Sequence, residues 1–306
     1  MTRLMLTRIL PPVLKDRLSA ESRPSRLEAP VQTVTYFSST FPRNAVGRRR
    51  SRSTQGGRRS ELGFGTPTKG RCTVTIDYDP IPPPGKLTAL QELRLPFDAL
   101  RWASEWATMK AHKAKAPRTL ILLPGFGAGP SSMRILESFL RKCGHRVQDW
   151  GLGTNTGAAK DFRLKLEGVV KKSKAAHRQP VVLVGWSLGG FIAREYAREH
   201  PEDVRQVITL GSPVIGGPRY TATAGRYRAQ GHDLDQLEQN VKDRYKTPLT
   251  VPVTAIYSKR DGVVAWQACI DRWSPNVRHV EVSETHVGLG FAPGVMRIIA
   301  DAIEGM

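Results

Sequence analysis

The stretch PVVLVGWSLGGFIAREYAREH, residues 180–200, decides the fold of this chain. Its apolar first part, residues 180–185, predicts a buried strand, and the residues from Leu188 to His200 have the spacing of a helix. Between the two lies Gly185-Trp186-Ser187-Leu188-Gly189, which fits the pattern G-x-S-x-G. Glycines at these positions indicate a tight turn in which strand and helix pass close together. The sequence therefore predicts that the Ser187 hydroxyl is exposed on a strained turn, with a small residue at an ordinary tight turn as the alternative.

Strands and helices alternate on both sides of this turn. Short Val/Ile/Leu runs between amphipathic helices predict an α/β fold with a mostly parallel sheet that helices cover on both faces. The expected strands are residues 119–123, 145–150, 180–185, 204–211, 252–258 and 277–282. The expected helices are residues 131–144, 159–174, 188–200, 263–273 and 294–305. In such a sheet, ligands bind at the carboxyl ends of the strands.

A serine hydroxyl is a poor nucleophile unless a base takes its proton, so we looked for a histidine and an acid on later strand ends. Of the seven histidines, His286 lies in the loop after the last expected strand. Asp261 directly follows the strand before it. The chain order Ser187, Asp261, His286 is the order expected for such a triad on this type of sheet. The alternatives are a surface-loop histidine and a solvent-facing aspartate.

Acyl transfer also needs N–H donors for the oxyanion that forms on the substrate. The loop LLPGFGAGPSS, residues 122–132, follows the first strand of the series and is rich in glycine. We expect the backbone N–H of Phe126, paired with that of Leu188, to be the two donors. A glycine-rich loop can also hold phosphate, but the chain has no G-x-x-x-x-G-K-[ST] pattern.

With these motifs in order, residues 119–305 resemble the α/β-hydrolase superfamily, in particular its lipase and esterase branch and the small bacterial triacylglycerol lipases. The stretches that carry the resemblance are LLPGFGAG, WGLGTNTG (150–157), VGWSLGG, TLGSPVIG (209–216) and THVGLG. The resemblance implies the α/β-hydrolase fold, with Gly185, Trp186 and Gly189 forming the nucleophile elbow around Ser187. Those lipases usually have His-Gly where this chain has Pro124-Gly125, which puts the support of the oxyanion loop in doubt.

A long segment separates Ser187 from Asp261, and in compact lipases it is shorter. Residues 214–247 lie between two strands whose exits flank Ser187, so we expect them on the active edge of the sheet. The second part of this segment, LDQLEQNVKDRY, places Leu234, Leu237 and Val241 on one helical face. The resemblance implies a lid over an acyl pocket. The alternative is a surface helix that is packed permanently against the domain.

The N-terminal part differs in composition. Residues 1–86 hold 16 Lys and Arg against 6 Asp and Glu, half of the net charge of +20. They have little apolar content, so we expect a disordered basic segment, apart from one candidate strand at residues 72–78. Residues 87–116 have helical spacing, with Pro96 dividing or opening the second half, and predict an amphipathic lead-in helix that docks through Leu100, Ala103, Ala107, Trp102 and Trp106. Weak association with a membrane surface is the alternative for this helix.

Taken together, the motifs favour a serine hydrolase of the α/β domain, residues 117–306, that cleaves a lipid ester or another apolar acyl ester. An acyltransferase or thioesterase with the same triad, or a non-catalytic binding protein with a basic tail, are the competing interpretations. We expect no cofactor, no metal and no nucleic-acid partner. The three cysteines are odd in number and lack metal-site spacing, which is typical of reduced thiols in a cytoplasmic protein. The sequence leaves acyl length, alcohol and oligomeric state open.

Overall fold

The computed structural model describes residues 78–109 and 113–305. The chain divides into two units, residues 1–67 and 68–306, and all described residues belong to the second. Most of the expected basic segment, and the expected strand 72–78 except Tyr78, lie outside the described residues. The sequence analysis placed residues 78–85 in that segment. In the structure they form neither helix nor strand, and Ile81 is buried in one cluster with Val264.

The described residues contain one sheet of six strands, and every neighbouring pair is parallel. The strand order is β2-β1-β3-β4-β5-β6, so β1 lies next to the edge strand β2, and the later strands follow in chain order toward the other edge. The central strand β3 is buried at all six residues, as its Val/Leu run predicts. The strands are β1 (Thr119–Leu123), β2 (Arg146–Asp149), β3 (Val181–Trp186), β4 (Val204–Leu210), β5 (Val253–Ser258) and β6 (Val277–Val282). The predicted α/β fold is confirmed.

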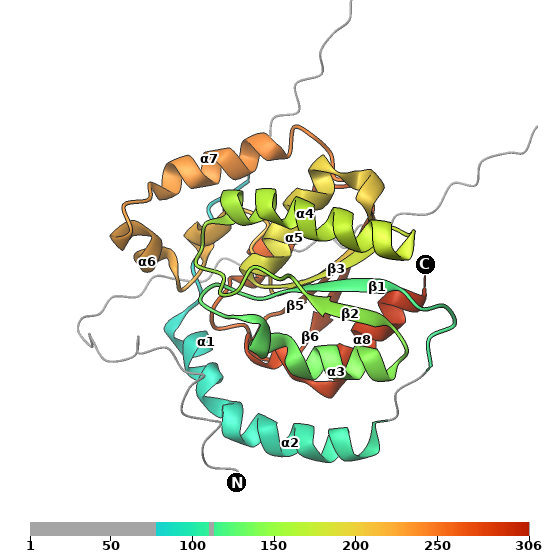
Figure 1. Cartoon of the computed structure of the whole chain (residues 1–306). Coiled ribbons are helices and arrows are strands. Elements are labelled where there is room, and N and C mark those ends of the chain that lie inside the picture. Colours follow the sequence, from blue (N-terminus) through green and yellow to red (C-terminus); the bar gives the residue numbers. More distant parts are fainter. Residues whose placement is uncertain (1–77, 110–112, 306) are drawn as a thin grey trace, which may run out of the picture. The chain divides into compact units, whose positions relative to one another are not determined.

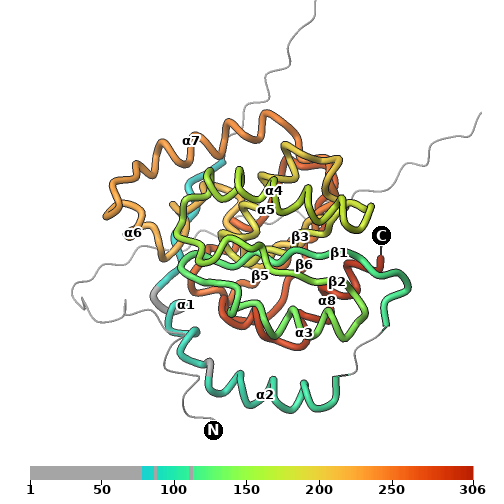
Figure 2. The backbone as a smooth tube through the Cα atoms, viewed as in Figure 1, coloured from blue at the N-terminus to red at the C-terminus, as the bar shows by residue number. Residues whose placement is uncertain are grey.

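Helices cover both faces of the sheet (Figures 1 and 2). One core cluster joins the sheet to α3 (Arg134–Lys142), α8 (Pro293–Glu304) and Trp102 of the lead-in helix. A second core cluster joins the opposite face to α4 (Ala159–His177) and α5 (Leu188–Glu199). Short 3-10 turns complete the series: η1 (Glu92–Arg94), η2 (Pro130–Met133), η3 (Pro201–Asp203), η4 (Gly217–Tyr220), η5 (Trp266–Cys269) and η6 (Gly288–Gly290).

The expected helix 263–273 is wrong. The structure has only the single turn η5 there, because residues before it are held extended by tertiary contacts. Val264 pairs with Thr221 in an isolated antiparallel bridge, and Val263 C=O accepts a hydrogen bond from Ala222 N–H. Thr221 and Ala222 belong to residues 214–247, which we call the insertion. Contacts with the insertion therefore override the local helical pattern.

The lead-in segment forms α1 (Lys86–Gln91), η1 and α2 (Leu95–Thr108), with Pro96 in the first turn of α2. Proline is tolerated there because the first helical N–H groups have no intrahelical partner. Trp102 is buried, as expected, and Trp106 is half-buried. Leu100 is 76% exposed and Ala103 and Ala107 are exposed as well, so these three residues do not form the expected docking face. Among the described residues, no helix combines the length and the apolar character needed to cross a bilayer.

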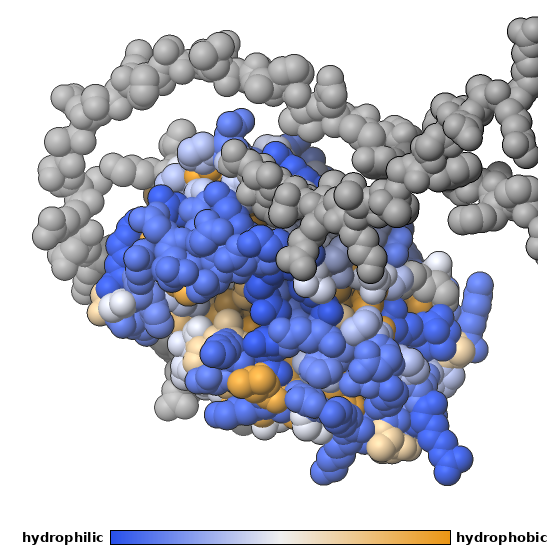
Figure 3. All heavy atoms as spheres, turned by 90° about the horizontal axis from the view of Figure 1, so that it is seen from above, coloured by the Kyte–Doolittle hydropathy of each residue, from blue (hydrophilic) through white to orange (hydrophobic). Residues whose placement is uncertain are grey.

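The segment between β4 and β5 contains η4, α6 (Ala224–Ala229) and α7 (Leu234–Arg244). Asp233 caps α7, since its carboxylate accepts hydrogen bonds from the N–H groups of Asp235 and Gln236. Leu234 and Val241 are the buried residues of α7. The face seen from above, over α4 and α7, is mostly hydrophilic (Figure 3). The inward apolar stripe of α7 agrees with the spacing in the sequence.

Candidate active site

Ser187 lies on a strained turn between β3 and α5. Its backbone angles are φ 53° and ψ −122°, a conformation that residues other than glycine rarely adopt. The turn is so tight that a methyl group on Gly185 would overlap the backbone of Gly190. Ser187 N–H donates to Leu210 C=O at 2.7 Å, which ties the turn to the end of β4. The neighbouring strand and helix thus force the serine into this geometry.

The structure brings His286 and Asp261 together, although they leave different strands. Nδ1 of His286 lies 2.6 Å from Oδ2 of Asp261, and both side chains are buried. The other carboxylate oxygen of Asp261 accepts hydrogen bonds from Val263 N–H at 2.8 Å and Val264 N–H at 2.7 Å. The carboxylate is therefore fixed from both sides and presents one oxygen to the imidazole.

The environment of His286 changes its acidity. Burial alone would lower the pKa of the imidazole, because a buried charge loses hydration. The charge and hydrogen bond of Asp261, with an additional contribution from the charge of Glu92, outweigh burial and raise the pKa of His286 above its ordinary value. The ring is thus a stronger base than a free histidine.

Two contacts place this pair beside the serine turn. Trp186 Nε1–H donates to His286 C=O at 3.2 Å, and the two rings lie 5.8 Å apart. Gly211, which follows β4 with φ 53°, passes close to both side chains: a methyl group there would lie 2.8 Å from Asp261 Oδ2 and 3.1 Å from His286 Nδ1. Only a glycine at this strand end leaves room for the pair.

The loop after β1 lies against the serine turn, since a methyl group on Gly125 would be 3.3 Å from Ser187 Cβ. Within the described residues, the N–H groups of Phe126 and Leu188 donate to no other backbone or side-chain group. Asn155 supports the loop from below, where it is fully buried: its Nδ2–H donates to Pro124 C=O at 2.9 Å, and its C=O accepts from Gly127 N–H at 2.7 Å. Two free donors thus remain near the serine.

A cavity of about 620 Å³ opens beside Ser187. Its volume is in the range of small-molecule sites. Its apolar lining comes from the oxyanion loop, α5, the insertion and the loop after Asp261, and includes Phe126, Leu188, Phe191, Ile192, Tyr227, Leu237, Val241, Val263 and Val264. Charged residues of α4, α5 and α7 also line it.

With this geometry in view, comparison with known proteins is informative. The model of the alpha/beta hydrolase family matches residues 120–300. The chain belongs to the alpha/beta hydrolase family. None of the curated proteins compared with the chain matches it.

Solved structures also match this alpha/beta hydrolase. Alpha/beta hydrolase domain-containing protein 10 from mouse is 20% identical, with a TM-score of 0.46, over 63% of this chain and 90% of that chain. Est1E from Butyrivibrio proteoclasticus with bound ferulic acid is 14% identical, with a TM-score of 0.47, over 62% and 88%. A monoacylglycerol lipase from Paleococcus ferrophilus is 14% identical, with a TM-score of 0.47, over 64% and 98%. Likenesses at this level carry no argument about substrate.

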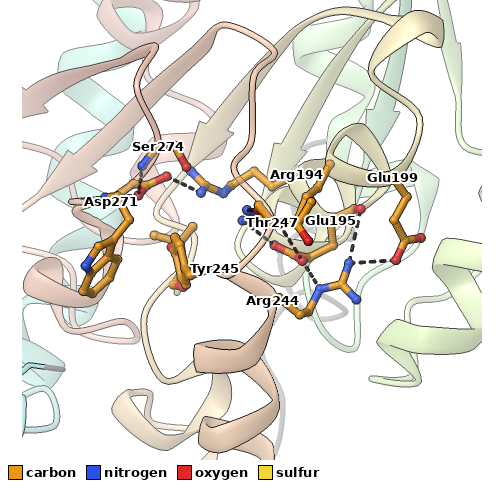
Figure 4. Close-up of polar contacts among 11 residues, drawn as sticks. Arg194, Glu195, Glu199, Arg244, Tyr245, Thr247, Asp271 and Ser274 are labelled. Carbon is orange, nitrogen blue, oxygen red and sulfur yellow. Dashed lines mark hydrogen bonds and ion pairs between the residues drawn. The ribbon is translucent and has the colours of Figure 1, made fainter. Parts of the chain in front are cut away.

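In this hydrolase, α7 is attached to the elbow helix α5 by ion pairs. Arg244 of α7 contacts the carboxylates of both Glu195 and Glu199, the second at 3.0 Å, and the three side chains converge in Figure 4. Glu195 is buried, which favours the neutral acid, but Arg198 and Arg244 outweigh burial and lower the pKa of its carboxyl. The insertion is therefore fastened by charge as well as by its apolar stripe.

A second buried ion pair braces the other side of α5 (Figure 4). Arg194 contacts Asp271, and both side chains are almost fully buried. Burial alone would raise the pKa of Asp271, but Arg194 and hydrogen bonds from the loop bring it down to about 2. Asp271 also accepts from Trp273 N–H and Ser274 N–H at 3.0 and 3.1 Å, so the pair joins α5 to the segment before β6.

Sequence reasoning missed three residues of this site. Asn155 lies in the quoted stretch 150–157, but its support of the oxyanion loop depends on a contact 31 residues away. Gly211 is the last residue of the expected strand 204–211 and lies just after β4 in the structure, and only the position of Asp261 and His286 explains the need for glycine there. Glu92 of η1 contacts the histidine loop across 194 residues, which no local pattern indicates.

Proposed function

We propose that the chain is a serine hydrolase that cleaves carboxylic esters with an apolar acyl group, such as lipid esters, through Ser187, His286 and Asp261. The observation that carries the proposal is the 2.6 Å contact between His286 and Asp261 at the strand ends that also hold the strained Ser187 turn. This nucleophile, base and acid arrangement is the one that acyl transfer requires.

In the proposed reaction, Ser187 Oγ attacks the acyl carbon while His286 Nε2 takes the hydroxyl proton. Asp261 holds Nδ1–H and stabilises the imidazolium that forms. The tetrahedral intermediate collapses when His286 returns the proton to the leaving alcohol, which leaves an acyl group on Ser187. A water molecule then attacks this acyl-enzyme with His286 as base, and the acid and free serine are released.

The oxyanion of each intermediate is assigned to the N–H groups of Phe126 and Leu188. Both are unused by other described groups, and Leu188 opens α5, whose N-terminal end favours negative charge. Oriented donors of this kind contribute on the order of 3 kcal/mol each to transition-state stabilisation in comparable sites. No cofactor is needed for this chemistry.

The cavity supports an apolar acyl group as substrate. Apolar side chains line it next to Ser187, and burying a methylene group there contributes about 0.8 kcal/mol to binding. Charged residues of α4, α5 and α7 also line the cavity, and we expect them to limit the length of an uncharged chain that fits. A panel of p-nitrophenyl esters of increasing acyl length tests this: kcat/KM should rise to a maximum at medium length and fall beyond it. Hydrolysis that is absent for every ester, with folded protein, would refute the proposed function.

We also propose that residues 214–247 act as the roof of the acyl pocket and that their opening admits substrate. Residues of η4, α6 and α7 line the cavity together with Ser187, which supports a roof. The ion pairs of Arg244 with α5 favour the closed arrangement. The alternative is a helix that is packed permanently against the domain.

Weak membrane-surface association is proposed for the lead-in segment. Leu90, Leu93, Phe97 and Leu100 share one face at helical spacing and are 54–76% exposed. The chain carries a net charge of +20, which favours anionic lipids. Full-length protein should co-sediment with anionic vesicles, and replacing Phe97 and Leu100 by Ser should reduce binding. Equal binding by this variant would exclude the segment as the lipid contact.

A further inference from the structure

Glu92 of η1 reaches into the triad loops from a segment that the family match does not cover. The matched residues begin at 120, whereas Glu92 belongs to residues 86–108, which we call the strap. Glu92 Oε1 accepts hydrogen bonds from His286 N–H at 2.7 Å and Gly262 N–H at 3.0 Å. Glu92 Oε2 accepts from Val287 N–H at 3.3 Å. One carboxylate thus spans the loop that carries Asp261 and the loop that carries His286.

The backbone around Gly262 is shaped to admit the strap. A methyl group on Gly262 would overlap Thr88 C=O and would lie 2.9 Å from Ala89 Cα and 3.0 Å from Glu92 Cγ. The residue beside the proposed catalytic acid therefore has to be small for the strap to approach. This close fit is independent of the hydrogen bonds and indicates a built contact.

Further polar contacts hold the strap on the same two loops. Arg260 Nε–H donates to Gln91 Oε1 at 3.0 Å, and Arg260 Nη1–H donates to Ser283 C=O at 2.9 Å. Arg101 forms a two-oxygen contact with Glu284, at 2.8 and 2.7 Å. The strap is therefore attached on both sides of Glu92, which keeps its carboxylate in place.

We propose that Glu92 is a positioning residue of the triad, and that through it the strap sets the alignment of His286 with Asp261. The inference rests on the proposed function. Three backbone donors on one carboxylate form charge-assisted hydrogen bonds, which are about twice as strong as neutral ones. Because both loops are held to one group, the backbone segments that carry Asp261 and His286 cannot move apart without breaking these bonds.

The charge of Glu92 has a second effect. The charged groups that act on the imidazole are Asp261, from the end of β5, and Glu92, from η1, and both favour its protonated form. Removing the Glu92 charge must therefore lower the pKa of His286. Since His286 acts as a base only when neutral, the acid limb of the activity profile should then move to lower pH.

The test compares Glu92→Gln, Glu92→Asp and Glu105→Gln in the full-length chain. Gln keeps the length of Glu but loses the charge and places an NH₂ group against N–H donors. Asp keeps the charge but is one methylene too short to span both loops. Glu105 lies on the same strap, and its carboxylate contacts only Arg101 among the described residues, so its replacement is the matched control.

With p-nitrophenyl butyrate, Glu92→Gln should lower kcat by about tenfold, the scale of a lost charged hydrogen bond, with little change in KM. Its acid limb should move to lower pH, whereas that of Glu92→Asp should stay near the wild-type position while kcat falls. Glu105→Gln should match wild type in both. If Glu92→Gln reduced only the melting temperature and left kcat and the acid limb unchanged, or if Glu92→Asp behaved like wild type in kcat, the proposal would be overturned.

A measurement without turnover separates this proposal from the proposed function. The pKa of His286 is followed by NMR in ¹³C-histidine-labelled Ser187→Ala protein, with the resonance assigned by its loss in His286→Gln. Adding Glu92→Gln should lower this pKa, and an unchanged value would contradict the positioning role. Ester hydrolysis that survives Ser187→Ala would instead refute the proposed function and leave the Glu92 result standing.

Discussion

Asp261 holds His286 with one carboxylate oxygen, at 2.6 Å from Nδ1, and is itself held through the other oxygen by Val263 and Val264 N–H. An acceptor that is fixed in this way selects one tautomer of the imidazole, with the proton on Nδ1 and the lone pair on Nε2. In the proposed reaction it also stabilises the imidazolium that forms when His286 takes the proton of Ser187. Orientation and charge therefore both depend on one side chain.

We predict that Asp261→Asn lowers kcat by about 10³- to 10⁴-fold, because the amide cannot stabilise the imidazolium and favours the wrong tautomer. The combined variant with Ser187→Ala should be no slower than Ser187→Ala alone, since the residues act as a unit. Steady-state kinetics with p-nitrophenyl butyrate measure both effects, with circular dichroism as a control for folding. Nearly full activity of Asp261→Asn would assign the acid role to another residue. Asp233 and Asp235, two acids of the segment before Asp261, are poor substitutes, because Asp233 caps α7 and Asp235 is exposed and pairs with Arg219.

The pH dependence of kcat/KM follows from the raised pKa of His286. The neutral imidazole is the active base, so activity falls as pH drops through this pKa. The midpoint of the acid limb should therefore lie above about 6.5, the ordinary value for histidine. In Asp261→Asn the residual activity should have its midpoint at lower pH, because the carboxylate no longer favours the protonated ring. A wild-type midpoint below the ordinary value would show that burial outweighs Asp261.

Two leucines of α7 distinguish a pocket roof from a structural helix. Leu237 lines the cavity and is half-buried, whereas Leu234 is 4% exposed and does not line it. We predict that Leu237→Ser shifts the preferred acyl length with little change in melting temperature, since it removes apolar surface from the pocket. Leu234→Ser should lower the melting temperature with the same length preference, because it buries a hydroxyl without a partner.

The outcome for these two variants decides between a roof and a permanently packed helix. The ester panel and a thermal melt are measured on both variants. Unchanged selectivity in Leu237→Ser, together with a large loss of stability, would assign α7 a structural role only, and the acyl pocket would have to be sought elsewhere.

Asn155 provides a test of the oxyanion loop. Asn155→Ala removes the hydrogen bond to Pro124 C=O and leaves that carbonyl buried without its donor. The loop that carries Phe126 N–H should then be less well positioned, and kcat should fall by about tenfold or more, with a smaller effect on KM. Thr156→Ala, at the exposed neighbouring position, is the matched control. Equal kcat in wild type and Asn155→Ala would remove Asn155 from the account.

The central part of the fold was predictable because its chemistry is local. The β3–α5 turn needs small residues at fixed positions around Ser187, and Val/Leu strands with amphipathic helices leave a clear pattern. All six strands appear within about two residues of their expected bounds. The helix expected at 263–273 failed because Val264 pairs with Thr221, a contact that the sequence pattern does not contain.

The supporting residues of the site were not predictable, because their roles also depend on contacts between distant parts of the chain. Gly211 has to be glycine because the side chains of Asp261 and His286 lie against it. Glu92 forms a hydrogen bond with His286, which lies 194 residues later in the chain. Such roles exist only after the strands are assembled. Leu100 shows the converse: its spacing suits a docking face, yet α2 turns Trp102 inward and leaves Leu100 exposed.

The most direct test of the central claim is covalent labelling of Ser187. Full-length protein is treated with a fluorophosphonate, digested and examined by mass spectrometry, with Ser187→Ala and His286→Ala in parallel. One label per chain on the peptide that contains Ser187, no label in Ser187→Ala and much slower labelling in His286→Ala are the predicted results. Labelling at another residue, or none in active wild-type protein, would contradict the assignment of Ser187 as the nucleophile.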